Sequence, residues 1–218
     1  MTYSLENNIA ILRFDDGKAN AVSHDFIDQM LEGLDKAEQE AGAVVVLGRD
    51  GMFSAGFDLK EIQKGPDAAA NLVGRGAEMM HRMFGYPMPL VAGSTGHAIA
   101  AGAFMLLASD TRVGASGDFR IGLNETAISM VLPVFGFELA RTRLSKRHQT
   151  AAVIQAQLFP PEEARDAGFL DHVVDADKVE STCIEAATTL AELPTQVYGA
   201  QKRKLREDPL AKMAADLN

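Results

Sequence analysis

The sequence is poor in the features that mark secreted, membrane-spanning and nucleic-acid-binding proteins. Its 218 residues include a single cysteine, so no intramolecular disulfide can form. No apolar run approaches the roughly 20 residues that cross a bilayer, and the opening MTYSLENN lacks the basic start and apolar stretch of a signal peptide. The net charge of −9 is opposite to the field that binding to nucleic acids or membrane surfaces requires. We therefore expect a cytoplasmic protein that binds neither.

Two common kinds of site also lack their sequence signatures. The five histidines show no metal-ligand spacing, and a lone cysteine offers no pair for zinc. The GxGxxG phosphate signature is absent, which argues against a nucleotide-dependent redox role. Cys183 falls in a predicted helix, far from any His or Asp pattern, and is expected to be an ordinary buried thiol. We expect no metal and no separate cofactor.

The hydrophobic residues, 47% of the chain, are enough for one sizeable core. In the first half, short apolar runs alternate with longer amphipathic ones, which predicts an α/β layer arrangement. From Pro133 the pattern is helical almost to the end. We expect an α/β core over residues 1–150 and a helical region over residues 151–218. The expected strands cover 8–14, 43–49, 89–95, 111–116 and 118–123, and the expected helices cover 24–40, 67–84 and the apolar part of 96–110.

Two segments of small residues run from a strand into a helix, at 53–60 and 96–103. Small side chains let a ligand approach the backbone, and the start of a helix presents free N–H groups. Taken alone, the first segment is compatible with a tight turn in which Asp58 caps a helix. Together, the two turns could aim two N–H donors at one oxygen, which is how an enolate or a tetrahedral oxyanion is stabilised.

Three motifs give the sequence a resemblance to a known family: SAGFDLKEI, TGHAIAAGAF and IGLNETAI. In this order and at these separations they resemble the crotonase (enoyl-CoA hydratase/isomerase) superfamily. The segments FDDGKANAVS and LFPPEEARDAGFLDHVV are similar too, so the resemblance covers nearly the whole chain. Within the superfamily, GLNET with FPPEEA resembles the mitochondrial-type 3,2-enoyl-CoA isomerases and short bacterial enoyl-CoA hydratases. The resemblance implies a ClpP-like spiral of ββα units, an acyl-CoA thioester substrate that brings its own coenzyme A, and a homotrimer or hexamer built through the carboxy-terminal helices.

The resemblance also implies roles for individual residues. The backbone N–H groups of Phe57 and Ala101 would form the oxyanion hole, and Glu125 would be the catalytic acid or base. The superfamily's hydratases use a second glutamate, at a position that is Phe104 in this sequence. The residues expected to bind the acyl-CoA substrate are Lys18, Ala19, Ala55, Gly56, Phe57, Asp58, Leu59, Lys60, Ala101 and Phe104.

A single glutamate favours isomerisation over hydration. Adding water across a 2-enoyl thioester requires an activated water and a proton delivered to C2, which two carboxylates share naturally. Moving a double bond from the 3,4 to the 2,3 position requires one base, and Glu125 could serve alone, with an apolar surrounding raising its pKa. The alternatives are a 2-enoyl-CoA hydratase and a non-catalytic acyl-CoA-binding protein.

Several charged residues have less specific expectations. His97 is either a proton carrier or a packed residue. Glu61 is expected to serve helix capping and solvation, the alternative being that it faces the acyl pocket. Asp110 and Arg112 are expected to form a structural pair. The basic cluster of Lys202, Arg203, Lys204 and Arg206 is either a solvated helix face or an anchor for the phosphates of coenzyme A.

Overall fold

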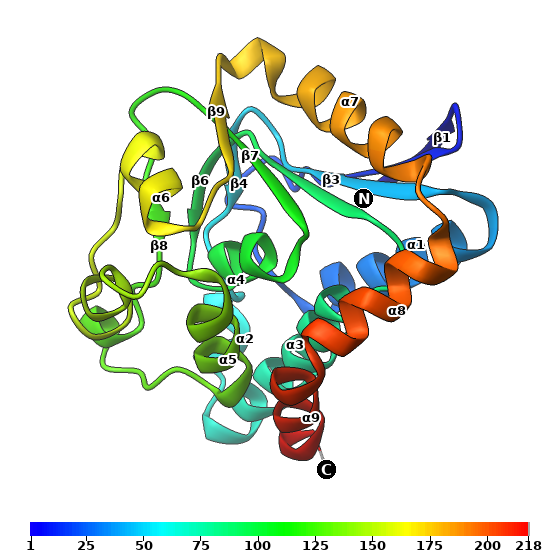
Figure 1. Ribbon diagram of the computed structural model, residues 1–218. Coiled ribbons are helices and arrows are strands. Elements are labelled where there is room, and N and C mark those ends of the chain that lie inside the picture. Colours follow the sequence, from blue (N-terminus) through cyan, green and yellow to red (C-terminus); the bar gives the residue numbers. More distant parts are fainter. Residues whose placement is uncertain (218) are drawn as a thin grey trace.

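A six-stranded sheet forms the larger layer of the protein (Figure 1). The computed structural model describes residues 1–217. The strand order is β1-β2-β3-β5-β7-β9, and all neighbours are parallel except the antiparallel pair β1 and β2. The strands are β1 (Thr2–Glu6), β2 (Ile9–Arg13), β3 (Ala43–Leu47), β5 (Leu90–Ser94), β7 (Thr111–Ala115) and β9 (His172–Val174).

A second, smaller sheet contains three short parallel strands in the order β4-β6-β8. Its members are β4 (Gly51–Ser54), β6 (Gly96–Ile99) and β8 (Ile121–Gly122). Because the strands are parallel, the segments that follow them all leave from the same edge of this sheet. The candidate site described below lies at that edge.

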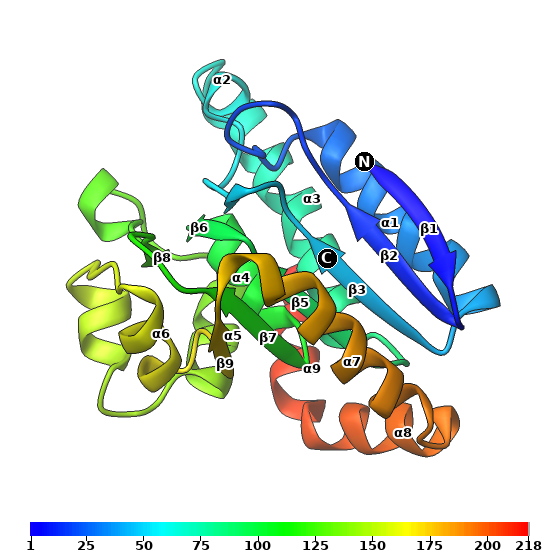
Figure 2. The same cartoon turned by 90° about the horizontal axis from the view of Figure 1, so that it is seen from above.

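Besides three short 3-10 or π-helical turns, residues 1–217 contain nine α-helices. They are α1 (His24–Glu40), α2 (Leu59–Ile62), α3 (Pro66–Phe84), α4 (Ala101–Ala108), α5 (Val134–Arg143), α6 (Pro161–Ala167), α7 (Val179–Ala191), α8 (Thr195–Leu205) and α9 (Glu207–Asp216). Figure 2 shows α7 lying across β3 and β7, while α1 contacts β2 and β3 from the other side of the sheet. Among the described residues, no helix combines the length and apolar character that a membrane crossing demands.

The larger sheet is apolar on both faces, as expected for parallel strands covered by helices on either side. In β3, Val45 packs in the cluster under α7 with Cys183, whereas Val44 and Val46 belong to the main core with α1. This alternation is the period of two along a strand. Cys183 is buried, as predicted, and burial raises the pKa of its thiol to about 12.

Local sequence signals set the ends of the long helices. Ser23 caps α1 by accepting a hydrogen bond from the N–H of Phe26, and α3 begins at Pro66, where a missing N–H has no cost. The short helix α4 is different because all eight of its residues are buried. It runs through the core and places its amino-terminal end beside the small sheet.

The predicted fold class is confirmed as an α/β arrangement of two mostly parallel sheets with carboxy-terminal helices. The strands β1, β4, β6 and β9 were not predicted as separate strands. The strand β9 lies in the half expected to be helical, and it pairs with β7. The division into residues 1–150 and 151–218 stays a prediction.

The expected pair between Asp110 and Arg112 was wrong. Arg112 binds Asp171 through two side-chain hydrogen bonds of 2.9 and 2.6 Å. Asp110 instead pairs with Lys202 and Arg206, both of which are buried. The basic cluster is therefore split, because Lys202 and Arg206 are buried and share Asp110 while Arg203 and Lys204 are exposed.

Candidate functional site

Three loops meet at the carboxyl edge of the small sheet. They follow β4, β6 and β8 and begin at residues 55, 100 and 123. The strand pairing holds them together, since Ile99 pairs with Gly122, and the N–H of Ala100 donates to the oxygen of Gly122 at 3.0 Å. The edge beyond the carboxyl ends of parallel strands is where ligands bind in many α/β proteins.

The first loop leaves one backbone N–H free. The oxygen of Gly56 accepts from the N–H of Val22 at 2.8 Å, and the N–H of Asp58 donates to the oxygen of Val22 at 3.1 Å. Between these two bonds, the N–H of Phe57 has no acceptor within residues 1–217. Gly56 has φ +107, a left-handed conformation that suits glycine.

The second loop presents another free N–H at the start of α4. Ala101 is the first residue of this helix, and its N–H has no acceptor in the described part of the chain. The preceding residue, Ala100, has φ 52 and ψ −118, an uncommon conformation for a residue with a side chain. The two turns touch: a Cβ placed on Gly56 would lie 3.0 Å from the Cβ of Ala100 and 3.6 Å from the nitrogen of Ala101. Two unpaired donors thus come from neighbouring turns.

The third loop carries Glu125, which is only 6% exposed. Its Oε2 atom is buried and has no hydrogen-bond partner among residues 1–217. Burial raises the pKa of Glu125 to about 6, and the backbone N–H groups of Asn124 and Glu125 partly oppose this rise. The N–H groups of Ile128 and Met130 donate to the main-chain oxygen of Glu125 and fix the turn that holds it.

Phe104 packs into the core between α4 and α5. It is 1% exposed, and its ring meets that of Phe135 edge-on, with 5.2 Å between the ring centroids. The ring also fills the space over Gly136, where an added Cβ would lie 2.8 Å from its Cζ atom. Position 104 is therefore occupied by an apolar contact between helices and offers no proton donor or acceptor.

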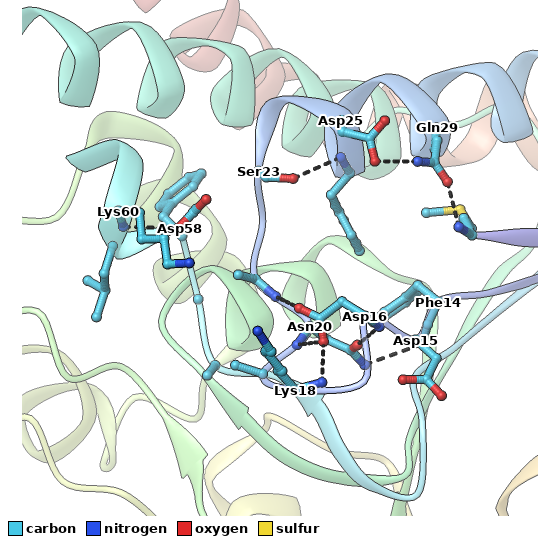
Figure 3. Close-up of a pocket in the computed structure, with 18 residues that line it drawn as sticks. Phe14, Asp15, Asp16, Lys18, Asn20, Ser23, Asp25, Gln29, Asp58 and Lys60 are labelled. Atoms are coloured by element: carbon cyan, nitrogen blue, oxygen red, sulfur yellow. Dashed lines mark hydrogen bonds between the residues drawn. The ribbon is translucent and has the colours of Figure 1, made fainter. Parts of the chain in front are cut away.

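A cavity of about 540 Å³ opens beside the first loop (Figure 3). Figure 3 shows Lys60 with Asp58 beside it on one side of the cavity and Lys18 on another. Neither ammonium group has an ion-pair partner within the described residues, while Asp58 caps α2 by accepting from the N–H of Lys60 at 2.9 Å. Of the predicted ligand-binding residues, Lys18, Ala19, Ala55, Gly56, Phe57, Asp58, Leu59 and Lys60 line this cavity, whereas Ala101 and Phe104 do not, and neither does the predicted catalytic residue Glu125.

Comparisons with known proteins identify the family. Residues 4–216 match the profile of the enoyl-CoA hydratase/isomerase family. The chain belongs to this family. It is 28% identical over 204 residues to human mitochondrial enoyl-CoA delta isomerase 1, covering 91% of this chain and 68% of that protein. It is also 28% identical over 199 residues to a probable enoyl-CoA hydratase of Bacillus subtilis, covering 88% and 74%.

A solved structure extends the same similarity to the fold. The enoyl-CoA hydratase/isomerase family protein from Pseudomonas syringae superposes with a TM-score of 0.97 at 39% sequence identity, covering 99% of this chain and 94% of that one. The relatives carry the names of both isomerases and hydratases, and family membership implies an acyl-CoA thioester as the substrate.

Other candidate residues of this family member have structural partners. The Nδ1 atom of His97 accepts from the N–H of Arg120 at 3.0 Å, and its ring packs edge-on against Phe119. Glu61 pairs with Lys64 and lies 3.7 Å from His24. In residues 1–217 no group of three His, Cys, Asp or Glu side chains is placed to hold a metal ion.

Sequence reasoning missed two buried polar residues beside the first loop, Asn20 and Ser54. The turn-forming residues in FDDGKANAVS signal a loop there, but they do not reveal where its side chains point. Some of the hydrogen bonds of Asn20 and Ser54 span more than 30 residues of sequence, including the one between the hydroxyl of Ser54 and the main-chain oxygen of Asn20.

Proposed function

We propose that the protein shifts the double bond of a 3-enoyl-CoA to the 2-trans position. The observation that carries this proposal is that the third loop holds the buried carboxylate of Glu125, whereas position 104 holds a core phenyl ring and no second carboxylate. Isomerisation needs one group that removes a proton and returns it two carbons away. Hydration needs a second group to share the work between water and C2.

In the proposed reaction, the thioester oxygen lies on the N–H groups of Phe57 and Ala101. Glu125 takes a proton from C2, and the electrons of the C2–H bond pass into a dienolate whose negative charge gathers on that oxygen. The same carboxyl group then returns the proton to C4, which leaves the double bond between C2 and C3. Each donor of this kind is typically worth about 3–4 kcal/mol in the transition state.

The environment of Glu125 supports its role as the base. With a pKa of about 6, it is mostly ionised at neutral pH, yet it is a stronger base than an exposed carboxylate. Its Oε2 atom, buried and without a partner in residues 1–217, is free to receive a proton.

Coenzyme A would lie in the cavity beside the first loop. Lys18 and Lys60 have no competing ion pairs within the described residues and would meet its phosphates, while Ala19, Ala55 and Gly56 let the adenine and pantetheine approach the backbone. No separate cofactor enters the reaction, since coenzyme A is part of the substrate.

The test compares two thioesters by ultraviolet absorbance, with trans-3-hexenoyl-CoA and crotonyl-CoA as substrates. We expect the conjugated 2-enoyl product to appear from the first faster than crotonyl-CoA is hydrated. Faster hydration would favour the hydratase suggested by the name of the Bacillus relative. Binding of both thioesters without turnover would favour a non-catalytic acyl-CoA-binding protein.

The proposal includes a homotrimer, or two stacked trimers, built through the carboxy-terminal helices. Leu193, Val197 and Leu205 are exposed; Leu193 lies just before α8, the other two lie eight residues apart on it, and all three line one surface pocket. An apolar face of this kind is typical of association surfaces. Light scattering is expected to give a mass three or six times that of the chain.

A further inference from the structure

Ser54 links the segment that contains Asn20 to the first loop, which carries Phe57. The side chain of Ser54 is 0% exposed. Its hydroxyl donates to the main-chain oxygen of Asn20 at 2.7 Å and accepts from the N–H of Gly56 at 3.2 Å. The hydroxyl therefore fixes the residue directly before the free N–H of Phe57.

The acceptor of this hydroxyl is itself held rigidly. The side-chain amide of Asn20 donates to the main-chain oxygens of Phe14, Met52 and Phe53 at 3.1–3.2 Å, and its Oδ1 accepts from the N–H of Asp16 at 2.9 Å. Figure 3 shows the bonds between Asn20 and Asp16 at the wall of the cavity. Asn20 has φ +50, a conformation that asparagine tolerates better than most residues. Hydrogen bonds to its own loop and to β4 thus fix the position of Asn20, including its main-chain oxygen.

The backbone of Ser54 also supports the second donor. A Cβ placed on Gly102 would lie 2.4 Å from the main-chain oxygen of Ser54 and 2.9 Å from its Cβ. The start of α4 therefore packs directly on Ser54, and Gly102 follows Ala101, which carries the second free N–H. Ser54 therefore contacts Gly56, which precedes Phe57, and Gly102, which follows Ala101.

We propose that Ser54, held by Asn20, is a positioning residue that sets the separation between the N–H groups of Phe57 and Ala101. This inference rests on the proposed function, which needs both donors on one oxygen. An oxyanion donor must lie about 2.7–3.1 Å from the developing charge, and a misplacement of about 1 Å can cost about 100-fold in rate. Without the hydroxyl, the buried N–H of Gly56 loses its partner and its peptide turns to find another.

The experiment compares S54A with the matched control S109A. Ser109 is equally buried, and its hydroxyl donates to one main-chain oxygen, that of Met105 at 2.9 Å, at the far end of α4. Each variant loses one buried hydroxyl. We would measure kcat and KM on trans-3-hexenoyl-CoA, and the infrared stretch of the ¹³C-labelled thioester carbonyl of bound hexanoyl-CoA, a saturated ligand without turnover.

We expect S54A to lower kcat about 10- to 100-fold with KM within about twofold, and to move the carbonyl stretch back toward its value in water. S109A should change neither. S54C keeps a weak donor and acceptor of similar size, so its kcat and carbonyl stretch should lie between those of S54A and the wild type. It also replaces S54A in the comparison if S54A does not fold.

Each failure has its own signature. A wild-type stretch and kcat in S54A, or in S54C should S54A not fold, would overturn the positioning role while leaving the isomerase proposal intact. If the wild type lowers the carbonyl stretch but does not isomerise, the proposed reaction fails, and the shift in S54A still decides the role of Ser54. A wild-type protein that binds hexanoyl-CoA without lowering the stretch would overturn both.

Discussion

Replacing Glu125 by glutamine should remove activity and, at the same time, stabilise the fold. The substitution keeps the shape of the side chain and removes its charge. Glu125 is 6% exposed, its Oε2 has no partner within residues 1–217, and burial raises its pKa from the ordinary 4.5 to about 6. By the standard conversion, that rise corresponds to about 2 kcal/mol spent on keeping the ionised group buried.

The cost of burying the ionised Glu125 depends on pH, and it lowers the stability of the folded chain as the pH rises. Below about pH 4.5 the carboxyl group is protonated in both the folded and the unfolded chain, so there is no cost. Between 4.5 and 6 the folded chain keeps a proton that the unfolded chain releases, and stability therefore falls as the pH rises. Above about 6 the full cost remains. At pH 8 the free energy of unfolding of the E125Q variant should exceed that of the wild type by up to about 2 kcal/mol. The unpaired buried amide of the glutamine should reduce this gain by about 1 kcal/mol.

The assay is urea unfolding of wild type and E125Q at pH 4.5 and pH 8, together with isomerisation of trans-3-hexenoyl-CoA. We expect the stability gain only at pH 8, and a loss of activity of about 10²- to 10⁴-fold. E138Q is the matched control, because Glu138 is also 6% exposed but is paired with Arg141 and Lys212. The free energy of unfolding of E138Q should fall by up to about 1 kcal/mol, and the variant should keep its activity. An active E125Q, or one with the same stability change at both pH values, would refute the reasoning.

Three further results are expected. The kcat/KM of the wild type should rise with pH through about 6 as Glu125 loses its proton, and a profile flat from pH 5 to 7 would contradict its role. D110N leaves Lys202 and Arg206 buried without their carboxylate, and the free energy of unfolding by urea should fall by about 3–5 kcal/mol. A fall below about 1 kcal/mol would mean that the two cations move into water. G56A forces φ +107 on a residue with a Cβ and should lower kcat at least about tenfold together with the melting temperature; unchanged values would show that the turn adapts.

Local sequence patterns were enough to predict the long elements. The helix expected over residues 24–40 is α1 with the same bounds, and the one expected over 67–84 is α3, which begins one residue earlier. In both, an apolar stripe repeats at the helical period between clear end signals. The strands β3 and β5 were predicted for a similar reason, as short apolar runs between turns.

The short strands and the charge partners depended on distant segments. The strands β4 and β9 have four and three residues, too few for an alternating pattern. They are strands because they pair with the neighbouring strands β6 and β7. Asp110 and Arg112 are neighbours in sequence, yet their partners lie 92 and 59 residues further along the chain. Proximity in sequence could not predict those pairs.

The sequence by itself determined the membership in the family, the order of the main elements and the identity of the side chains at positions 104 and 125. These follow from residue types and their spacing. Only the tertiary structure decided which backbone N–H groups stay unpaired and how deeply Glu125 is buried. The physical reason is that a hydrogen bond or a desolvated charge depends on every group within a few ångströms, and at this site those groups come from strands, loops and helices that are far apart in the chain.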